Sequence, residues 1–525
     1  MSSTIKTENE KHSRYASRID LYYSLLLVIL IALCFVIASD STASDFAHWF
    51  ILPVLISGII LGVGVIRWFR GKTDILDPTS ILSLLGFHLF FIAPLLHVSL
   101  DWQLTSGYRQ PDNWTPWLGK MAVLNLLGIV LFILTSFFIK NSALVSISHS
   151  GARTVWKLHH KRFLLAIGTA MALSLILQVR VYQQFGGITN YINSAVVARD
   201  SSFQGMGAIF LFSESFPILF MMLYAVLAQR HKQLRNWPAL TLVLVIFFIL
   251  CLFFGGLRGS RSNTIWSLFW GLGIIHFTVR RIAKHHIALG LCFLMLFMYI
   301  YGFYKVGGLD TLNSALSGAQ ERSSLEQESG RTWQALLLAD FGRSDVQAAM
   351  LYILTQPNND YEYAFGKTYL AGVSILLPSP VRPNIQPDKI EAGTNLFFGH
   401  NSYDPVGPRT IESSKVYGLA GESMLNFGPL SVPYTAIPFA ILIGWISRCF
   451  ADWRQSKDVR ILLLPALINF GFIVLISDFD NNTFFLVKNI SFPFLIIFLG
   501  SQKGTLRLSD FVPHRKEIQN LKNNI

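Results

Sequence analysis

Two arginines in the segment GGLRGSRSN are the residues of this chain best suited to bind an anion. Arg258 and Arg261 are three positions apart, so on a helical turn they would share one face. The serines and the asparagine beside them are good N-cap types, and a helix N-terminus with free N–H groups binds phosphate. Because a planar guanidinium donates two parallel hydrogen bonds, the pair predicts a diphosphate site. The alternative is a pair of arginines that reach lipid head groups from a helix end.

The segment GLAGESMLNFGPL, residues 418–430, adds a carboxylate just before a long apolar stretch. Glu422 could accept a proton from a sugar hydroxyl as a general base, or it could stabilise the N-terminus of the next helix. Asn426 could hydrogen-bond a sugar or the loop backbone. His400 is a second candidate base, flanked by aromatic residues that could stack on sugar rings; the alternative is an ordinary surface histidine.

Three further arginines are candidate ligands for a diphosphate: Arg180, Arg343 and Arg382. Arg382 lies in a proline-rich stretch, LPSPVRPNIQP, whose stiffness would fix its position. The pair Asp478 and Asp480 has a spacing seen at divalent-metal diphosphate sites, but acidic residues are also common in exposed turns. Since the arginines already supply positive charge, we predict no metal ion and no cofactor.

The composition shows what kind of molecule must position these residues. The chain has 525 residues, of which 52% are hydrophobic and 14% charged, which is typical of a polytopic membrane protein. A net charge of +13 would suggest nucleic acid in a soluble protein. Here the basic residues lie in short segments between apolar spans, so we predict no nucleic-acid partner. The N-terminus has no cleavage site after the first apolar run, which we interpret as a retained span.

A bilayer core needs roughly 20 apolar residues per helix, and about twelve candidate spans meet that rule. They are Leu21–Ala38, Ala47–Ile66, Thr79–Leu96, Trp117–Ile139, Phe163–Leu177, Met206–Leu227, Pro238–Phe254, Asn263–Thr278, Ile287–Tyr304, Val432–Phe450, Ile461–Ile476 and Thr483–Gly500. Most of the 43 Lys and Arg fall in alternate connecting segments, which by the positive-inside rule places both termini in the cytoplasm. Arg180, Arg258 and Arg261 lie at outward span ends, against this bias.

We therefore expect an all-α protein with five parts: a cytoplasmic tail (1–20), spans one to nine (21–304), a large periplasmic loop (305–430), spans ten to twelve (431–500) and a second cytoplasmic tail (501–525). Within the loop, Arg331–Gln356 has apolar residues at helical spacing, which predicts one or two interfacial helices. The loop would close over the arginine segment at the membrane surface.

Several of these segments resemble the O-antigen polymerase family, the Wzy-type polymerases of oligosaccharide repeat units. The matching features are DPTS at 77–80, LRGSRS at 257–262, YAFGKTYL followed by LPSPVRP within 363–383, and GLAGESMLNFG at 418–428, together with the span number and the single large late loop. The resemblance covers most of the chain, through short and loosely defined motifs.

The resemblance implies a GT-C-like glycosyltransferase of the bacterial inner membrane, acting without metal at the periplasmic face. It would move a growing glycan from undecaprenyl diphosphate to the nonreducing end of a new lipid-linked repeat unit, in company with a flippase and a chain-length regulator. Three alternatives stay open. One is the related O-antigen ligase. Another is a transporter or flippase, for which charged residues near the bilayer midplane would be expected. The third is a transferase that uses lipid-monophosphate sugars with a metal ion, for which the pair Asp478 and Asp480 would matter.

Overall fold

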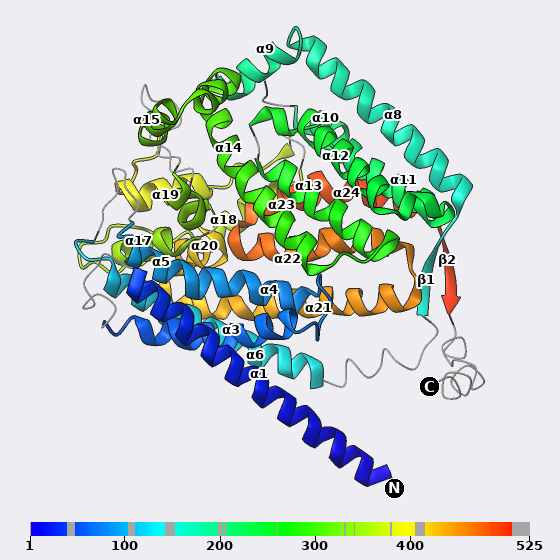
Figure 1. The fold of residues 1–525 in the computed structure, drawn as a ribbon. Coiled ribbons are helices and arrows are strands. Elements are labelled where there is room, and N and C mark those ends of the chain that lie inside the picture. Colours follow the sequence, from blue (N-terminus) through cyan, green and yellow to red (C-terminus); the bar gives the residue numbers. More distant parts are fainter. Residues whose placement is uncertain are drawn as a thin grey trace.

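In the computed structural model the chain forms a bundle of long helices with a layer of short helices at one end (Figure 1). The structure describes residues 2–38, 48–102, 111–141, 153–197, 203, 206–259, 261–329, 332–340, 342–377, 381–404 and 415–506.

Ten helices in these ranges are long and apolar enough to cross a membrane, which confirms a multi-pass, mainly helical protein. The ten are Arg18–Ile37, Ile51–Phe69, Pro78–Ser99, Thr115–Ile139, His160–Gln184, Gly207–Arg230, Trp237–Arg258, Lys284–Ser317, Pro429–Ser456 and Phe479–Leu499. Their helical elements are α1 (Ser2–Ala38), α3 (Ile51–Phe69), α4 (Pro78–Phe87) with η1 (His88–Ile92) and α5 (Ala93–Ser99), α6 (Thr115–Asn141), α8 (His160–Gln184), α10 (Gly207–Ser213) with α11 (Phe216–Arg230), α12 (Trp237–Phe253) with η6 (Gly256–Arg258), α14 (Lys284–Ser317), η10 (Pro429–Thr435) with α21 (Ala436–Ser456), and α23 (Phe479–Phe485) with η12 (Leu486–Ile490) and α24 (Ser491–Leu499).

The two other expected spans are helical but are not among the ten helices that are both long and apolar enough to cross a membrane. They are α13 (Arg261–Ile274), which continues as the π-helical η7 (Ile275–Val279), and α22 (Leu464–Ile476), which has only 13 residues. The two pack against each other, and the indole of Trp270 donates to the carbonyl of Leu462 at 2.8 Å. The number twelve therefore stays a prediction, since these two segments are short helices inside the bundle.

Predicted helix starts can be checked at the third span. The carboxylate of Asp77 accepts a hydrogen bond from the backbone N–H of Ser80 at 2.9 Å, and Pro78 occupies the first helical position. This is the N-cap that the sequence DPTS predicts.

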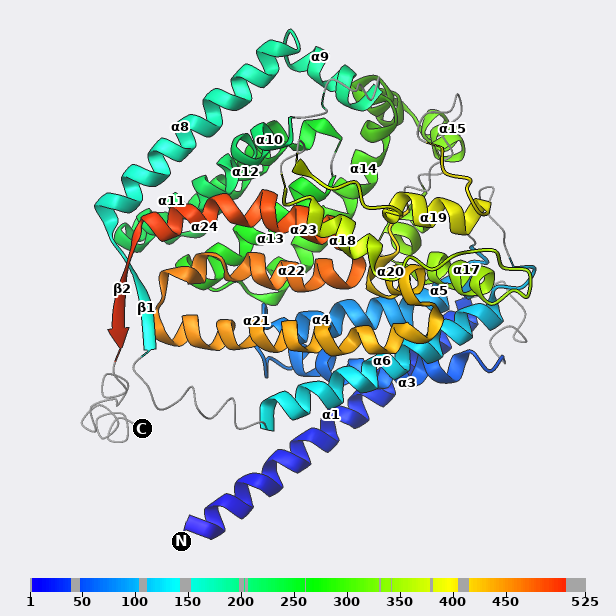
Figure 2. The same cartoon turned by 180° about the vertical axis from the view of Figure 1, so that it is seen from behind.

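One end of the bundle, here called the basic end, carries most of the resolved ion pairs of Lys and Arg. Asp20 binds Arg70 and Lys72, each at 2.7 Å, and Asp74 binds Arg454 at 3.1 Å. The N-terminal end of α1 lies at this end, as does a two-stranded antiparallel ribbon of β1 (Arg153–Leu158) and β2 (Ser501–Leu506) (Figure 2). The sequence did not predict this ribbon, and β2 occupies the start of the expected second tail.

The short helices at the opposite end form what we call the outer layer. They are α15 (Ala319–Ser329), α16 (Trp333–Ala335) with η8 (Leu336–Asp340), α17 (Ser344–Leu354), α18 (Lys367–Ser374), α19 (Lys389–Phe398) and α20 (Gly418–Phe427). The helices predicted in Arg331–Gln356 are present as α16, η8 and α17, and their interfacial position stays a prediction. Val346, Met350 and Ile353 are buried, in one core with residues of α3 to α6. The outer layer is therefore packed onto the bundle.

The boundaries expected at 20 and 304 do not coincide with ends of elements. Helix α1 begins at Ser2, and α14 continues to Ser317 with non-helical backbone only at Gly307 and Gly308. The helix α1 thus continues through residue 20, whereas α14 is kinked at Gly307 and Gly308, three residues after the boundary expected at 304. The division into five parts stays a prediction.

Candidate functional site

Arg258 belongs to a group of charged and polar side chains inside the bundle, here called the Arg258 cluster: Glu214, Arg258, Asn263 and Lys488. The guanidinium of Arg258 lies 2.8 Å from one carboxylate oxygen of Glu214, and Lys488 binds the other oxygen. Asn263 completes the cluster, since its amide donates to Glu214 at 3.2 Å and accepts from Lys488 at 3.0 Å. Two cations and one anion leave a net positive charge.

The cluster is buried, but Arg258 remains accessible. The side chains of Glu214 and Lys488 are 6% and 4% exposed, whereas that of Arg258 is 20% exposed. Glu214 lies seven residues from the start of its span, about 10 Å along a helix axis. Lys488 lies in the π-helical segment η12, a type of distortion that is frequent at functional sites. Arg258 is thus the accessible charged member of the cluster, whereas Glu214 and Lys488 are buried.

The backbone around Arg258 is held in one conformation by neighbouring side chains. The hydroxyl of Tyr301 donates to the carbonyl of Gly256, and that of Tyr304 donates to the carbonyl of Leu257 at 2.6 Å. Gly255 has a φ of 151°, and a Cβ there would lie 2.9 Å from the carboxylate of Glu214. A glycine is therefore required for Glu214 to approach this turn.

Arg258 and Arg261 do not share one helical face. Gly259 is left-handed, with a φ of 83°, so the turn η6 ends at Arg258 and α13 begins at Arg261. The guanidinium of Arg258 lies over the ring of Phe210, 4.0 Å from its centre. Arg261 instead lines a small cavity with residues of α14 (Met298, Tyr299, Gly302) and of the outer layer (Thr332, Ala335, Leu336). The prediction of a shared helical face was wrong because the left-handed Gly259 ends one helix before the next begins at Arg261.

Glu422 and Asn426 are at the centre of a second buried group, here called the Glu422 network. The two carboxylate oxygens of Glu422 accept from the hydroxyl of Thr368 at 2.8 Å and from the N–H of Phe479 at 2.6 Å. The amide of Asn426 donates to Thr368 at 2.7 Å and accepts from the N–H of Gly366 at 2.8 Å. The network joins α18, α20 and the start of α23.

The carboxyl of Glu422 is only 2% exposed. Burial, followed by the nearby charge of Asp478, raises the pKa of Glu422 to about 8, although hydrogen bonds from Phe479 and Thr368 oppose this. The raised pKa favours the protonated form of this carboxyl at neutral pH. Its predicted role as a general base stays a prediction, and it would require both access to substrate and loss of that proton.

Lys389 lies between the two aspartates that the sequence offered as an alternative metal site. Its ammonium is 3.1 Å from Asp478 and 3.3 Å from Asp480. Burial opposes the charge on Lys389, but these two carboxylates outweigh it and raise the pKa of the ammonium. The other oxygen of Asp478 accepts from the N–H groups of Tyr417 and Gly418, both at 2.8 Å, at the N-terminus of α20. These aspartates therefore hold α19 and α20 against the last span.

The other predicted site residues are placed around the outer end of the bundle. Arg343 donates to the carbonyl of Ile476 at the end of α22, at 3.1 Å, which favours that helix terminus. Arg382 is exposed and donates to the carbonyls of Ile375 and Leu377, both at 3.3 Å. Arg180 and His400 are exposed, the former near the end of the peripheral helix α8 (Figure 1). Their roles as ligands and as a base stay predictions.

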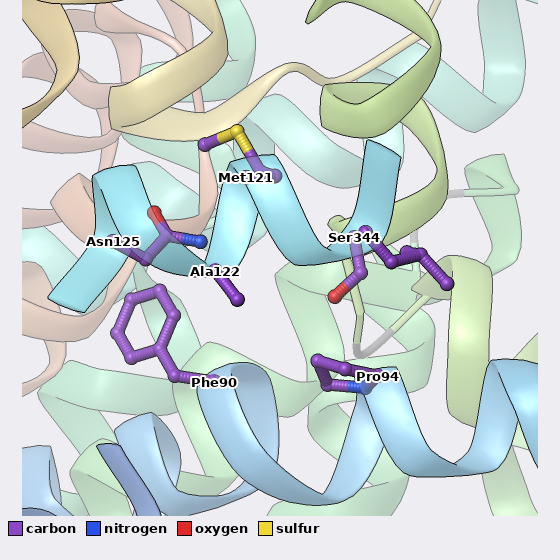
Figure 3. Close-up of a pocket in the computed structure, with 7 residues that line it drawn as sticks. Phe90, Pro94, Met121, Ala122, Asn125 and Ser344 are labelled. Atoms are coloured by element: carbon purple, nitrogen blue, oxygen red, sulfur yellow. The ribbon is translucent and has the colours of Figure 1, made fainter. Parts of the chain in front are cut away.

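A cavity between α6, the η1–α5 segment and the start of α17 is a weaker candidate (Figure 3). It is lined by Phe90, Pro94, Leu118, Met121, Ala122, Asn125 and Ser344. The lining has two polar residues and no charged one, so it offers neither a base nor a ligand for an anion.

Sequence reasoning missed Glu214 and Lys488 as members of the arginine site, and Lys389 and Thr368 as partners of the carboxylates. A signal existed for the first two, because a charged residue within an apolar span indicates a functional site by default. No family model, no curated protein and no solved structure matches this chain. The site is therefore interpreted from its own geometry.

Proposed function

We propose that this protein is a membrane glycosyltransferase that uses a polyprenyl-diphosphate-linked oligosaccharide as donor. The single observation that carries the proposal is the Arg258 cluster. It holds a guanidinium at the outer end of the spans, partly accessible and fixed by Glu214 behind it. A diphosphate attached to a lipid in the membrane is an anion that could reach this depth, and bidentate donors suit it.

The chemistry assigns a role to that charge. The acceptor hydroxyl oxygen forms a bond to the anomeric carbon, the bond from that carbon to the diphosphate oxygen breaks, and the hydroxyl proton passes to a base. Negative charge grows on the departing diphosphate. A preorganised donor aimed at such charge typically lowers the barrier by about 3–4 kcal/mol. Arg258 is the residue proposed for this role, with Arg261 on the next turn of chain as its second donor.

The same proposal places the molecule in the bacterial inner membrane. Its basic end would face the cytoplasm, as the positive-inside rule requires, with both termini there and the outer layer in the periplasm. The donor would then be undecaprenyl diphosphate bearing a growing glycan, as the resemblance to O-antigen polymerases implies. A GT-C-like fold, a flippase and a chain-length regulator as partners belong to this proposal.

The test begins with deletion of the gene in a strain that makes a lipopolysaccharide ladder. A polymerase is indicated if the ladder collapses to core plus one repeat unit, whereas loss of a ligase leaves no repeat unit on the core. Complementation with Arg258→Ala should then lower polymer formation by about 10²–10³. Arg162→Ala is the matched control, because Arg162 is an exposed arginine in the first turn of α8, beside the ribbon at the basic end. A full ladder with membrane-inserted Arg258→Ala would overturn the proposal.

One observation favours a second candidate, a transporter of lipid-linked oligosaccharide. Glu214 and Lys488 form a buried ion pair within apolar spans, and transporters use such residues in their pathways. In the deletion strain a lost transporter would leave lipid-linked units on the cytoplasmic side and no glycan at the surface. Protease-free labelling of surface sugars on intact spheroplasts separates the two candidates, since a polymerase mutant still displays single units.

A further inference from the structure

Helix α18 has the reverse of the amphipathic pattern of a helix on a water-soluble surface. Its polar and small residues Thr368, Gly372 and Ser374 are buried, whereas Leu370 and Val373 are 57% and 45% exposed. A helix in water buries its apolar face and exposes its polar one. A helix in contact with lipid instead turns its apolar face outward and packs its polar face against the protein.

The apolar surface continues beyond the helix. Leu376 and Leu377 follow α18 and are 55% and 44% exposed, and Phe365 precedes it at 75%. Together with Leu370 and Val373, these side chains form a contiguous stretch of chain whose large apolar groups face outward. Exposed apolar patches of this size on a folded protein mark a site of contact with a membrane or another protein.

The surroundings of α18 identify the membrane as the contact. Helix α18 lies beside α23, at the start of the last span (Figure 2). The ring of Tyr369 lies 5.5 Å from that of Phe479, and Gly372 approaches the backbone of Asp480 closely. The ring of Tyr369 also lies 6.4 Å from that of Phe427, just before the span Pro429–Ser456. Helix α18 therefore packs against the outer ends of two membrane helices, where the rings of Phe427 and Phe479 are themselves exposed.

The charges at the two ends of this stretch complement lipid head groups. Lys367 is exposed at the first residue of α18, and Arg382 is exposed after Leu377. Basic side chains flanking an apolar stretch reach phosphate groups while the stretch lies in the acyl boundary.

We propose that α18 lies in the plane of the membrane, with Leu370, Val373 and Leu377 among the acyl chains of the leaflet at the outer-layer end. Its opposite face carries Thr368, which donates to Glu422. The lipid leaflet thus supports the Glu422 network from outside. The proposal is independent of the reaction and would hold equally for a transporter.

Spin labels on single cysteines test the proposal. The full chain, with Cys34, Cys251, Cys292 and Cys449 replaced, is reconstituted into proteoliposomes with a label at Leu370→Cys or Val373→Cys. Collisions with oxygen, which concentrates in lipid, are compared with collisions with a water-soluble nickel chelate. Leu495→Cys in the last span is the lipid reference, and Ser324→Cys on the exposed polar helix α15 is the water reference.

The measured quantity is the ratio of collisions with oxygen to collisions with the chelate. We expect this ratio at Leu370 and Val373 to be several-fold higher than at Ser324 and to approach the ratio at Leu495. A ratio equal to that at Ser324 would place α18 in water and overturn the proposal. Protection from both reagents would also overturn it, because a second copy of the chain would then cover the surface. Matching circular dichroism spectra and gel-filtration profiles establish that each labelled chain is folded.

Discussion

The Arg258 cluster and the Glu422 network are both buried, both contain a carboxylate, and both contact the last membrane span. They differ in how completely their charges and hydrogen bonds are satisfied. In the Glu422 network each carboxylate oxygen of Glu422 has a donor, and the amide of Asn426 is bound at both ends. In the Arg258 cluster the cations outnumber the anion, and one of them is partly exposed.

This difference separates a group that can take up an anion from one that holds helices together. The side chain of Arg258 is partly open to an anion such as the proposed diphosphate, whereas Glu422 is 2% exposed and its carboxyl is bound by its own partners. The two groups are also connected. Phe479, whose N–H donates to Glu422, and Lys488 lie on the same span, nine residues or about 13 Å apart. The last span therefore contributes a residue to each of the two groups.

The largest effect is expected from Lys488→Met. Removal of the ammonium from this buried ion pair leaves Glu214 with Arg258 and the amide of Asn263, and the loss of a buried ion-pair partner costs up to about 3–5 kcal/mol of stability. The measurement is thermal or chemical unfolding of the purified protein in detergent. The double variant Glu214→Gln/Lys488→Met should recover only part of the loss, since it removes the buried carboxylate charge but also the ion-pair partner of Arg258. Equal stability of wild type and Lys488→Met would show that the ion pair of Lys488 and Glu214 does not stabilise the fold. The pair could then not be what holds Glu214 in place behind Arg258.

A smaller effect, dependent on pH, is expected from Glu422→Gln. The ordinary pKa of a glutamate is 4.5 and that of folded Glu422 is about 8, so between these values the folded protein holds a proton that the unfolded chain lacks. The contribution of this group to stability therefore falls as the pH rises from about 4.5 to about 8, by a few kcal/mol. Glutamine keeps the acceptor for Phe479 and gains a donor for Thr368.

The stability of Glu422→Gln should accordingly match that of wild type near pH 5 and exceed it near pH 8. Unfolding curves at the two pH values measure the difference. The same variant also sharpens the comparison between the two regions. A catalytic base would lose nearly all polymer formation on this change, whereas a residue that positions helices would keep most of it.

The smallest effects distinguish two glycines that flank Arg258. A Cβ at Gly255 would lie 2.9 Å from the carboxylate of Glu214, whereas a Cβ at Gly259 meets only Val196 at 3.5 Å. Gly259→Ala should cost about 1 kcal/mol through its left-handed backbone alone. Gly255→Ala should cost more and should also reduce activity, because it displaces Glu214. Equal activity of the two alanine variants would argue against a precisely placed Glu214.

The sequence was sufficient for features set by local composition. The span positions followed from apolar length, and Asp77 was found as a cap because its partners lie within three residues. The ribbon of β1 and β2 was missed because it pairs two segments that are far apart in the sequence, 153–158 and 501–506.

The candidate site was foreseen only in part for the same reason. Arg258 stood out through its unusual place at an outward span end. Its partner Glu214 and the bond from Lys488 to Glu214 join three distant spans, which no spacing rule predicts. The backbone at Gly259 separated two arginines that helical spacing would have put together.

The most direct test of the account is the binding of farnesyl diphosphate and farnesyl monophosphate to purified protein in lipid nanodiscs. Wild-type protein should bind the diphosphate more tightly than the monophosphate. Arg258→Ala should weaken binding of the diphosphate by about ten- to a hundredfold, the size of one charged hydrogen-bonded contact, and leave the monophosphate nearly unchanged. Equal affinity of wild type and Arg258→Ala for the diphosphate would contradict the assignment of the Arg258 cluster as the diphosphate site.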